Sequence, residues 1–233
     1  MNIHKIRATI YRDLREFFTN YAVLILLFMP PAMAGLYGMA ARSAEEVLPL
    51  IMIFVVLGTT LAAVTTNIPL MLYAEENEHG TLRLVTHTKS DLVNGLIGRS
   101  TLTLLITAAV TAVSLIIIDG MHIVSFQMLI GYTAAVIIFL NLGLWTGLLA
   151  KLQSTSTVYG AVILLFLGMT PIMETLNLAN SNFITGLAKL TPVYQLMAIH
   201  NNAGIMPYVI LTLWLTVTGF LVCIAISKRT KTL

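Results

Sequence analysis

Charged side chains are scarce in this sequence. Only 10% of its 233 residues are Asp, Glu, Lys or Arg, whereas about a quarter of the residues of a soluble domain are charged. Hydrophobic residues make up 58% of the chain, and the mean hydropathy is +0.89. A soluble chain of this length cannot hide so much apolar surface, so the composition predicts a protein that lies in lipid.

Several catalytic motifs are also missing. The P-loop pattern G-x-x-x-x-G-K-[ST] is absent, and the nearest stretch, residues 95–100 (GLIGRS), has the wrong spacing and no lysine. Neither H-E-x-x-H nor G-x-S-x-G occurs, and the five histidines lack the spacing of metal ligands. We therefore expect no bound cofactor or metal and no enzymatic activity. The single cysteine, Cys223, excludes an internal disulfide.

Six nearly charge-free runs are each long enough to cross about 30 Å of hydrocarbon, which takes roughly 20 residues. They cover about residues 21–41, 47–73, 92–118, 123–150, 157–178 and 207–227. The predicted fold is an all-α integral membrane protein with a six-span domain over residues 21–227. Pro30 and Pro31 predict a break or kink in the first span. Arg99, near the start of the third span, is expected to extend its side chain to the headgroups.

Residues 1–20 have the pattern of an amphipathic helix. Basic and acidic residues take the positions between apolar residues that recur at steps of three and four, namely Ile3, Ile6, Ile10, Leu14 and Phe17. A basic amphipathic helix of this kind lies in the headgroup layer of an anionic leaflet, so membrane lipid is an expected partner. An ordinary cytoplasmic helix is the alternative.

The Lys and Arg residues predict the orientation of the spans, because cytoplasmic segments are enriched in them. With the N-terminus inside, eleven of the 13 Lys and Arg residues lie on the cytoplasmic side, including those of the tail, 228–233. Only Arg42 and Lys189 lie outside. Both termini are therefore predicted to be cytoplasmic. The basic pI of about 9.1 then reflects topology, and nucleic acid is not an expected partner.

Residues 74–91 (AEENEHGTLRLVTHTKSD) concentrate charge between the second and third spans. The helix of the second span is expected to continue through Glu76, and Gly80 then allows a turn. Thr81 to Thr88 can form a short helix on the membrane surface, and Ser90 is the expected N-cap of the third span, with Asp91 in its first turn. This segment is either a surface for a soluble partner or a solvated hairpin.

The same segment resembles the permease subunits of type-2 ATP-binding-cassette transporters. The resemblance lies in the order Glu76-x-Glu78-x-Gly80-Thr81-Leu82, followed by Leu84-Val85-Thr86 and later by Gly98-Arg99. It extends over nearly the whole chain, because the family has an amphipathic N-terminal helix, six spans and an irregular outer region before the last span. His87 departs from the family, in which many members have proline.

The resemblance implies a division of labour between two kinds of polypeptide. Residues 74–91 would be the coupling helix, which docks on a separate dimeric ATPase subunit that uses ATP and magnesium. Residues 1–20 would be the connecting, or elbow, helix, and a second permease chain, identical or related, would complete the pathway. The family further implies a multi-pass protein of a plasma membrane, here bacterial. The expected ATPase-docking residues are Glu75, Glu76, Glu78, Gly80, Thr81, Leu82, Arg83 and Val85.

Two further groups of residues have a candidate role and a structural alternative. In the outer region, about residues 171–206, the family forms short re-entrant helices, and Pro171, Glu174 and Pro192 would form an outer gate. Glu174 is otherwise a simple interfacial carboxylate. Polar residues within the spans either line the pathway or pack against other helices; they are Thr59, Thr66, Asn67 and Asn141.

The expected function is the transmembrane permease subunit of an ATP-driven exporter. Its nearly charge-free spans favour an amphipathic or hydrophobic cargo, such as a peptide, a bacteriocin or a drug-like molecule. The alternative is a stand-alone secondary carrier or channel. Carriers coupled to protons usually place ionisable residues near the bilayer midplane, and the middle of most spans has none.

Overall fold

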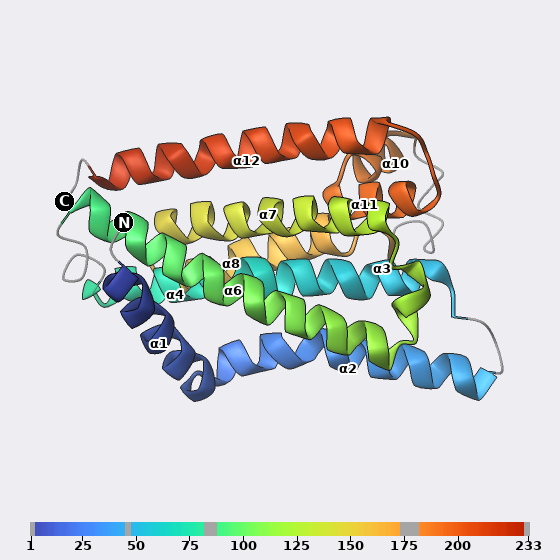
Figure 1. The fold of residues 1–233 in the computed structure, drawn as a ribbon, viewed down its shortest axis with the longest axis horizontal. Coiled ribbons are helices and arrows are strands. Elements are labelled where there is room, and N and C mark those ends of the chain that lie inside the picture. Colours follow the sequence, from blue (N-terminus) through green and yellow to red (C-terminus); the bar gives the residue numbers. More distant parts are fainter. Residues whose placement is uncertain (1–2, 45–47, 82–87, 173–181, 231–233) are drawn as a thin grey trace.

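The computed structural model describes residues 3–44, 48–81, 88–172 and 182–230. All regular structure within these four ranges is helical, without a strand, so the all-α prediction is confirmed. The helices run roughly along one long axis, and the start of α1 and the end of α12 lie at the same end of the molecule (Figure 1). We call this the proximal end; the distal end holds α10 (Asn182–Lys189) and α11 (Pro192–His200).

Five helices are long and apolar enough to cross a membrane, which makes the chain a multi-pass membrane protein. They are Tyr21–Ser43, Leu50–Glu78, Ser90–Ile117, Phe126–Leu149 and Met206–Arg229. The fifth predicted span is shorter than expected. It consists of α8 (Gln153–Ile163, 11 residues) and η3 (Leu164–Gly168, 5 residues), which together cover about 24 Å at 1.5 Å per residue.

The first span, α2 (Tyr21–Ala44), continues through both of its prolines. Of the predicted break or kink at Pro30 and Pro31, the break does not occur, and the kink stays a prediction. Each proline removes one backbone donor and crowds the carbonyl four residues earlier, but the turns on either side keep their hydrogen bonds. Membrane helices tolerate such interruptions because a non-helical backbone would leave still more polar groups unsatisfied in lipid.

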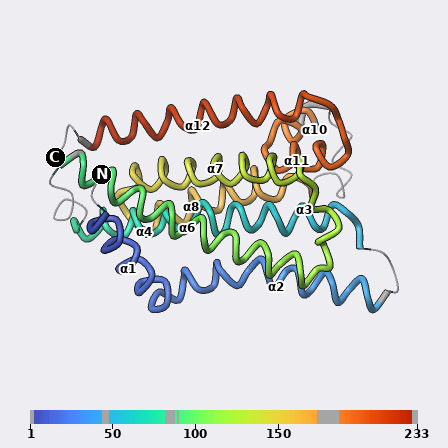
Figure 2. Tube along the Cα trace, in the orientation of Figure 1, coloured from blue at the N-terminus to red at the C-terminus, as the bar shows by residue number. Residues whose placement is uncertain are grey.

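The second span is the central helix of the bundle. It joins α3 (Leu50–Thr59), the π-helical segment η1 (Thr60–Thr66) and α4 (Asn67–Glu78) into one continuous helix. Its most hydrophobic window is 89% buried, compared with 50% or less in the other four spans. The long helices α2, α6 (Lys89–Ile117) and α7 (Phe126–Leu149) pack against it. The last helix, α12 (Met206–Thr230), packs on α7 instead, as the chain trace in Figure 2 also shows. A short 3₁₀ turn, η2 (Gly120–Ile123), links α6 to α7.

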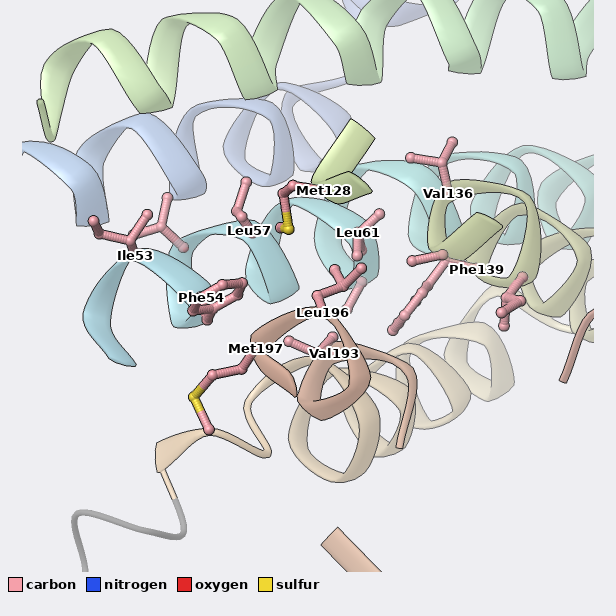
Figure 3. Close-up of a cluster of buried hydrophobic side chains, with 14 of the residues drawn as sticks. Ile53, Phe54, Leu57, Leu61, Met128, Val136, Phe139, Val193, Leu196 and Met197 are labelled. Atoms are coloured by element: carbon pink, nitrogen blue, oxygen red, sulfur yellow. The ribbon is translucent and has the colours of Figure 1, made fainter. Parts of the chain in front are cut away.

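The main apolar core forms where the central helix meets α7 and the short distal helix α11. Figure 3 shows side chains of the three elements in contact, with Phe54 and Leu57 of α3 near Leu196 of α11 and Phe139 of α7 close by. These side chains are almost completely buried. In lipid such contacts are stabilised by close packing rather than by removal of apolar surface from water.

Glycines allow the closest helix crossings. A Cβ atom on Gly58 of α3 would lie 1.9 Å from the carbonyl oxygen of Gly168 in η3, and one on Gly143 of α7 would lie 2.4 Å from the carbonyl oxygen of Thr66. Small residues let membrane helices approach to backbone contact. The central helix is therefore held between η3 on one side and α7 on another.

Candidate functional site

A cluster of buried ionic side chains lies near the proximal end and is centred on Arg99 of α6. The Arg99 side chain is only 1% exposed. Its Nε and Nη2 donate to the two carboxylate oxygens of Asp13, at 2.8 and 3.1 Å, and its Nη1 and Nη2 donate to Glu76, at 3.2 and 3.0 Å. The guanidinium carbon lies 4.1 Å from the centre of the Tyr73 ring. The expectation that Arg99 reaches the headgroups is wrong, because two carboxylates inside the protein satisfy its planar fork.

The Asp13 side chain comes from the N-terminal helix, α1 (Ile3–Thr19), and is completely buried. It also accepts from Arg12, at 3.1 Å to Nη2. The α1 helix packs against α6, where a Cβ on Gly98 would lie 3.0 Å from the carbonyl oxygen of Ile6. The sequence pattern placed Asp13 among the surface charges of an amphipathic helix and missed its role. The available signal was an acidic residue on a mostly basic helix, together with an arginine early in an apolar span.

The three residues Glu76, Asn77 and Glu78 connect α4 to four other helices. Glu76 binds Arg99 of α6 and, at 2.5 Å, Arg12 of α1. Asn77 donates to the carbonyl oxygens of Gly147 and Ala150, at 3.2 and 2.8 Å, where α7 ends. Glu78 accepts from the backbone amide of Gln153 at 2.7 Å and so caps the start of α8. The carbonyl oxygens at the end of α7 and the amide at the start of α8 have no partner within their own helices, and the side chains of Asn77 and Glu78 supply one.

The C-terminal helix also makes polar contacts with the proximal end of α7. Arg229 of α12 donates through Nε and Nη2 to the carbonyl oxygen of Leu148, at 2.8 and 2.6 Å. A basic side chain at the end of a helix interacts favourably with its last carbonyls. The proximal end is therefore a network in which short polar contacts join α1, α4, α6, α7, α8 and α12.

The segment after α4 follows the predicted path as far as the structure describes it. Gly80 has a φ of +69°, so the predicted turn is confirmed, and Glu78 and Thr81 are exposed. The N-cap of α6 is Thr88 rather than Ser90, because the extended Thr88 accepts from the amide of Asp91 at 3.2 Å. Three of the predicted docking residues lie outside the described residues: Leu82, Arg83 and Val85.

A second pair of carboxylates lies next to the Arg99 cluster. Glu75 is partly buried and accepts from Asn20 at 3.4 Å. Burial, and then repulsion from Glu75, raise the pKa of Glu16 to about 7, with smaller contributions from its other neighbours. Glu16 thus lies among the carboxylates of Asp13, Glu75 and Glu76, and its raised pKa leaves it partly protonated near neutral pH.

Replacing Glu16 with glutamine should flatten the pH dependence of stability. The folded chain keeps a proton on Glu16 up to about pH 7, whereas the unfolded chain loses it near pH 4.5, so the free energy of unfolding falls as pH rises between these values. Above pH 7 we expect Glu16→Gln to be more stable than the parent by at most about 1 kcal/mol, because the half-exposed site is screened by water. Melting curves of both proteins in detergent from pH 4 to 8 measure this. Parallel pH profiles would contradict it.

The four predicted pathway residues lie inside the bundle or at contacts between its helices. The hydroxyl of Thr59 donates to Val55 of its own helix at 2.8 Å, whereas that of Thr66 donates to Phe139 of α7, also at 2.8 Å. Asn67 lies against Gly160 of α8, and Asn141 donates to Thr218 of α12 at 3.4 Å. The wide π-helical turns of η1 alter the angular spacing between residues 59 and 66. These contacts are those of packing residues, and the pathway role stays a prediction.

Two of the three predicted gate residues come together at the distal end. Pro171 and Pro192 are both buried, and the preceding residues, Thr170 and Thr191, bring their hydroxyl oxygens to 2.9 Å. Pro192 occupies the first turn of α11, where a proline suits the helix. Glu174 lies outside the described residues.

Comparison with protein-family models, with curated proteins and with solved structures gives no match. In the part of the chain that the structure describes, no three His, Cys, Asp or Glu side chains gather as a metal site would require. The family resemblance therefore depends on the motif of residues 76–82 and on the order of the helices.

Proposed function

We propose that the chain is the transmembrane permease subunit of an ATP-driven exporter that works with a separate ATPase subunit. The observation that carries the proposal is the position of the Glu76–Gly80 motif. It follows the most buried span, ends in a turn at an exposed surface, and is joined by Glu76, Asn77 and Glu78 to four other helices. A partner that pulled or pushed on this segment would act on all of these helices.

The arrangement of the helices supports six crossings. The starts of α1 and α8 and the ends of α4, α7 and α12 all lie toward the proximal end in Figure 1. With α8 and η3 as the short fifth crossing, an even number of crossings returns the chain to the side on which it began. We infer that this side is the cytoplasm of a bacterial cell, with α1 as the connecting helix at the membrane surface.

The proposed transporter contains two permease chains and two ATPase subunits. One set of spans forms half of a pathway in the family that the sequence resembles, so a second copy or a related chain completes it. Apart from Arg42, the described spans carry their charges toward the proximal end, which supports an amphipathic or hydrophobic cargo such as a peptide, a bacteriocin or a drug-like molecule. Transport assays with a labelled panel would reject this cargo class if only hydrophilic glycans moved.

Replacing Leu82 and Val85 with aspartate should abolish binding of the ATPase subunit. Both residues are predicted apolar anchors of the docking segment, and a buried carboxylate without a partner would oppose docking. The measurement is affinity purification of the tagged chain from its native cell in mild detergent, followed by mass spectrometry for a polypeptide with a P-loop. Glu76 is kept intact because it holds Arg99.

Val124→Asp is the matched control, since Val124 is an exposed apolar residue at the distal end. The parent and this control should retain the ATPase subunit, and the Leu82/Val85 double variant should lose it. If the folded parent purifies without any P-loop polypeptide, the exporter proposal fails.

A stand-alone carrier is the second candidate, and the Arg99 cluster is the observation that favours it. Buried carboxylates in a membrane protein often carry protons, and Asp13 and Glu76 both line this cluster. A proton-coupled carrier would move cargo in liposomes that contain only this chain and a pH gradient. Transport that requires the ATPase subunit and ATP would exclude it.

A further inference from the structure

A cavity of about 350 Å³ lies beside the Arg99 cluster, and the proposed transport function does not use it. It opens between α1 and the first turns of α6, with part of α4 as its inner wall. Six of its lining residues matter to the argument: Lys5, Arg12, Glu76, Asp91, Gly95 and Arg99. Its volume is within the usual range of small-ligand sites, about 300–1,000 Å³.

Two glycines, one turn apart, create this cavity. At Gly98 the two helices are in contact, and a Cβ there would lie 3.1 Å from the Cβ of Thr9. At Gly95 a Cβ would meet no neighbouring side chain or helix within 4 Å. The cavity is therefore the space that opens between α1 and α6 as they separate from their contact at Gly98.

The charges that line the cavity are balanced. Lys5 forms an ion pair with Asp91, and Arg12 forms one with Glu76 at 2.5 Å, while Arg99 is already neutralised by Asp13 and Glu76. A simple anion would meet Glu76 and Asp91 as well as the cations, and a simple cation would meet Lys5 and Arg12. A zwitterion can instead place each of its charges against the opposite sign.

The basic side chains that line the cavity are also more exposed than the acidic ones. The side chains of Lys5 and Arg12 are 56% and 41% exposed, whereas those of Glu76 and Asp91 are each 11% exposed. Water partly screens an ion pair whose cation is exposed, so a ligand can exchange these two pairs for contacts of its own. The arrangement suits a ligand whose positive group enters first and whose negative group stays near the opening.

The length of α6 predicts that the cavity lies at the level of lipid headgroups. The 29 residues of α6 extend about 44 Å, which matches the full thickness of a bilayer with its headgroup layers, about 40–45 Å. The first turns of α6, which carry Asp91 and Gly95, therefore belong to the headgroup layer. The ligand source at this depth is the membrane itself or the adjoining solution.

We propose that this cavity binds a phosphate–ammonium zwitterion of the phosphoethanolamine type. Glu76 and Asp91 accept from the ammonium group, and Lys5 and Arg12 donate to the phosphate. The same headgroup can belong to a membrane lipid or to a soluble ester, and the experiment separates these two sources. The inference is independent of the exporter proposal, because it concerns the chain alone.

Native mass spectrometry of the full chain in detergent tests the proposal with an equal mixture of phosphatidylethanolamine and phosphatidylglycerol. The parent should retain one phosphatidylethanolamine molecule in preference to phosphatidylglycerol. Gly95→Leu fills the open space and should lose this one-lipid adduct. Gly219→Leu is the control, because Gly219 in α12 also faces open space but lies far from the cavity along the chain, and it should keep the adduct.

A second variant protects the test against misfolding of Gly95→Leu. Lys5→Gln combined with Asp91→Asn removes one ion pair without leaving either charge unpaired, and it should also lose the adduct. Competition by glycerophosphoethanolamine would support a soluble source, whereas an adduct that resists it would support a lipid. Equal retention of phosphatidylglycerol, or a phosphatidylethanolamine adduct that survives in folded Gly95→Leu, would overturn the proposal.

Discussion

Replacing Arg99 with methionine should lower the free energy of unfolding by about 3–5 kcal/mol, the usual cost of removing one partner from a buried ion pair. Asp13 and Glu76 would keep their negative charges but lose the guanidinium that donates four hydrogen bonds to them. For a chain of this length the melting temperature should fall by roughly 6–20 °C. Thermal unfolding in detergent, followed by size-exclusion chromatography, measures the effect.

The rescue of this variant separates ionic from steric effects. Adding Asp13→Asn and Glu76→Gln to Arg99→Met removes the two charges that Arg99 no longer neutralises, and buried ion clusters can often be neutralised without loss of stability. The triple variant should therefore recover most of the lost melting temperature. Arg15→Met, an exposed change in the same N-terminal helix, should shift stability by no more than about 0.5 kcal/mol. If Arg99→Met melts like the Arg15 variant, the cluster contributes nothing to the fold.

The helices themselves could be predicted from local sequence alone. The runs predicted at 92–118, 123–150 and 207–227 correspond to helices at Lys89–Ile117, Phe126–Leu149 and Met206–Thr230. A run of apolar residues long enough for the bilayer has few alternatives to a helix, because lipid offers no partner for exposed backbone groups. The predicted and observed ends of these helices differ by a few residues. At the start of α6 two capping residues, Thr88 and Ser90, lie close together in the sequence, and either could begin the helix.

The ion cluster could not be predicted in the same way. Asp13 and Arg99 are separated by 86 residues, and only the packing of α1 on α6 at Gly98 brings them together. Taken singly, each residue fits a surface position, since arginines near span ends commonly reach the headgroups. The sequence reveals the motif of residues 76–78. Its contacts with α6, α7 and α8 cannot be predicted in this way, because they depend on where those helices begin and end in space.

The π-helical segment η1 shows a further limit of pattern reasoning. Thr59 and Thr66 are seven residues apart, which in a regular α-helix places them on nearly the same face. The wider turns of η1 alter this spacing, and the two hydroxyls donate to different elements, one to α3 and one to α7. A π-helix needs no special residue type that a sequence would reveal, and it is retained here by close packing on all sides.

Replacing Gly58 with alanine should strongly destabilise the fold, because the added methyl group meets the backbone of Gly168 as well as the side chain of Val193. The added Cβ would lie 1.9 Å from the carbonyl oxygen and 3.0 Å from the carbonyl carbon of Gly168. No rotamer change can relieve that overlap, so α3 and η3 would have to separate. We expect the free energy of unfolding to fall by about 3 kcal/mol or more, which is at the upper end of the effects of overpacking a core. Yield and melting temperature of the detergent-purified variant measure this.

Two other glycines turn this prediction into a ranked series. Gly160→Ala in α8 would bring a Cβ 1.8 Å from Oδ1 of Asn67, but a flexible amide can rotate away, so the cost should be smaller than at Gly58. Gly219→Ala in α12 faces open space, and it should raise stability by up to about 1 kcal/mol through its better helix propensity. The expected order of stability is Gly219→Ala, then Gly160→Ala, then Gly58→Ala. If the Gly160 variant were the least stable, Asn67 would be held more rigidly than backbone, as a residue of the pathway or of another functional site would be.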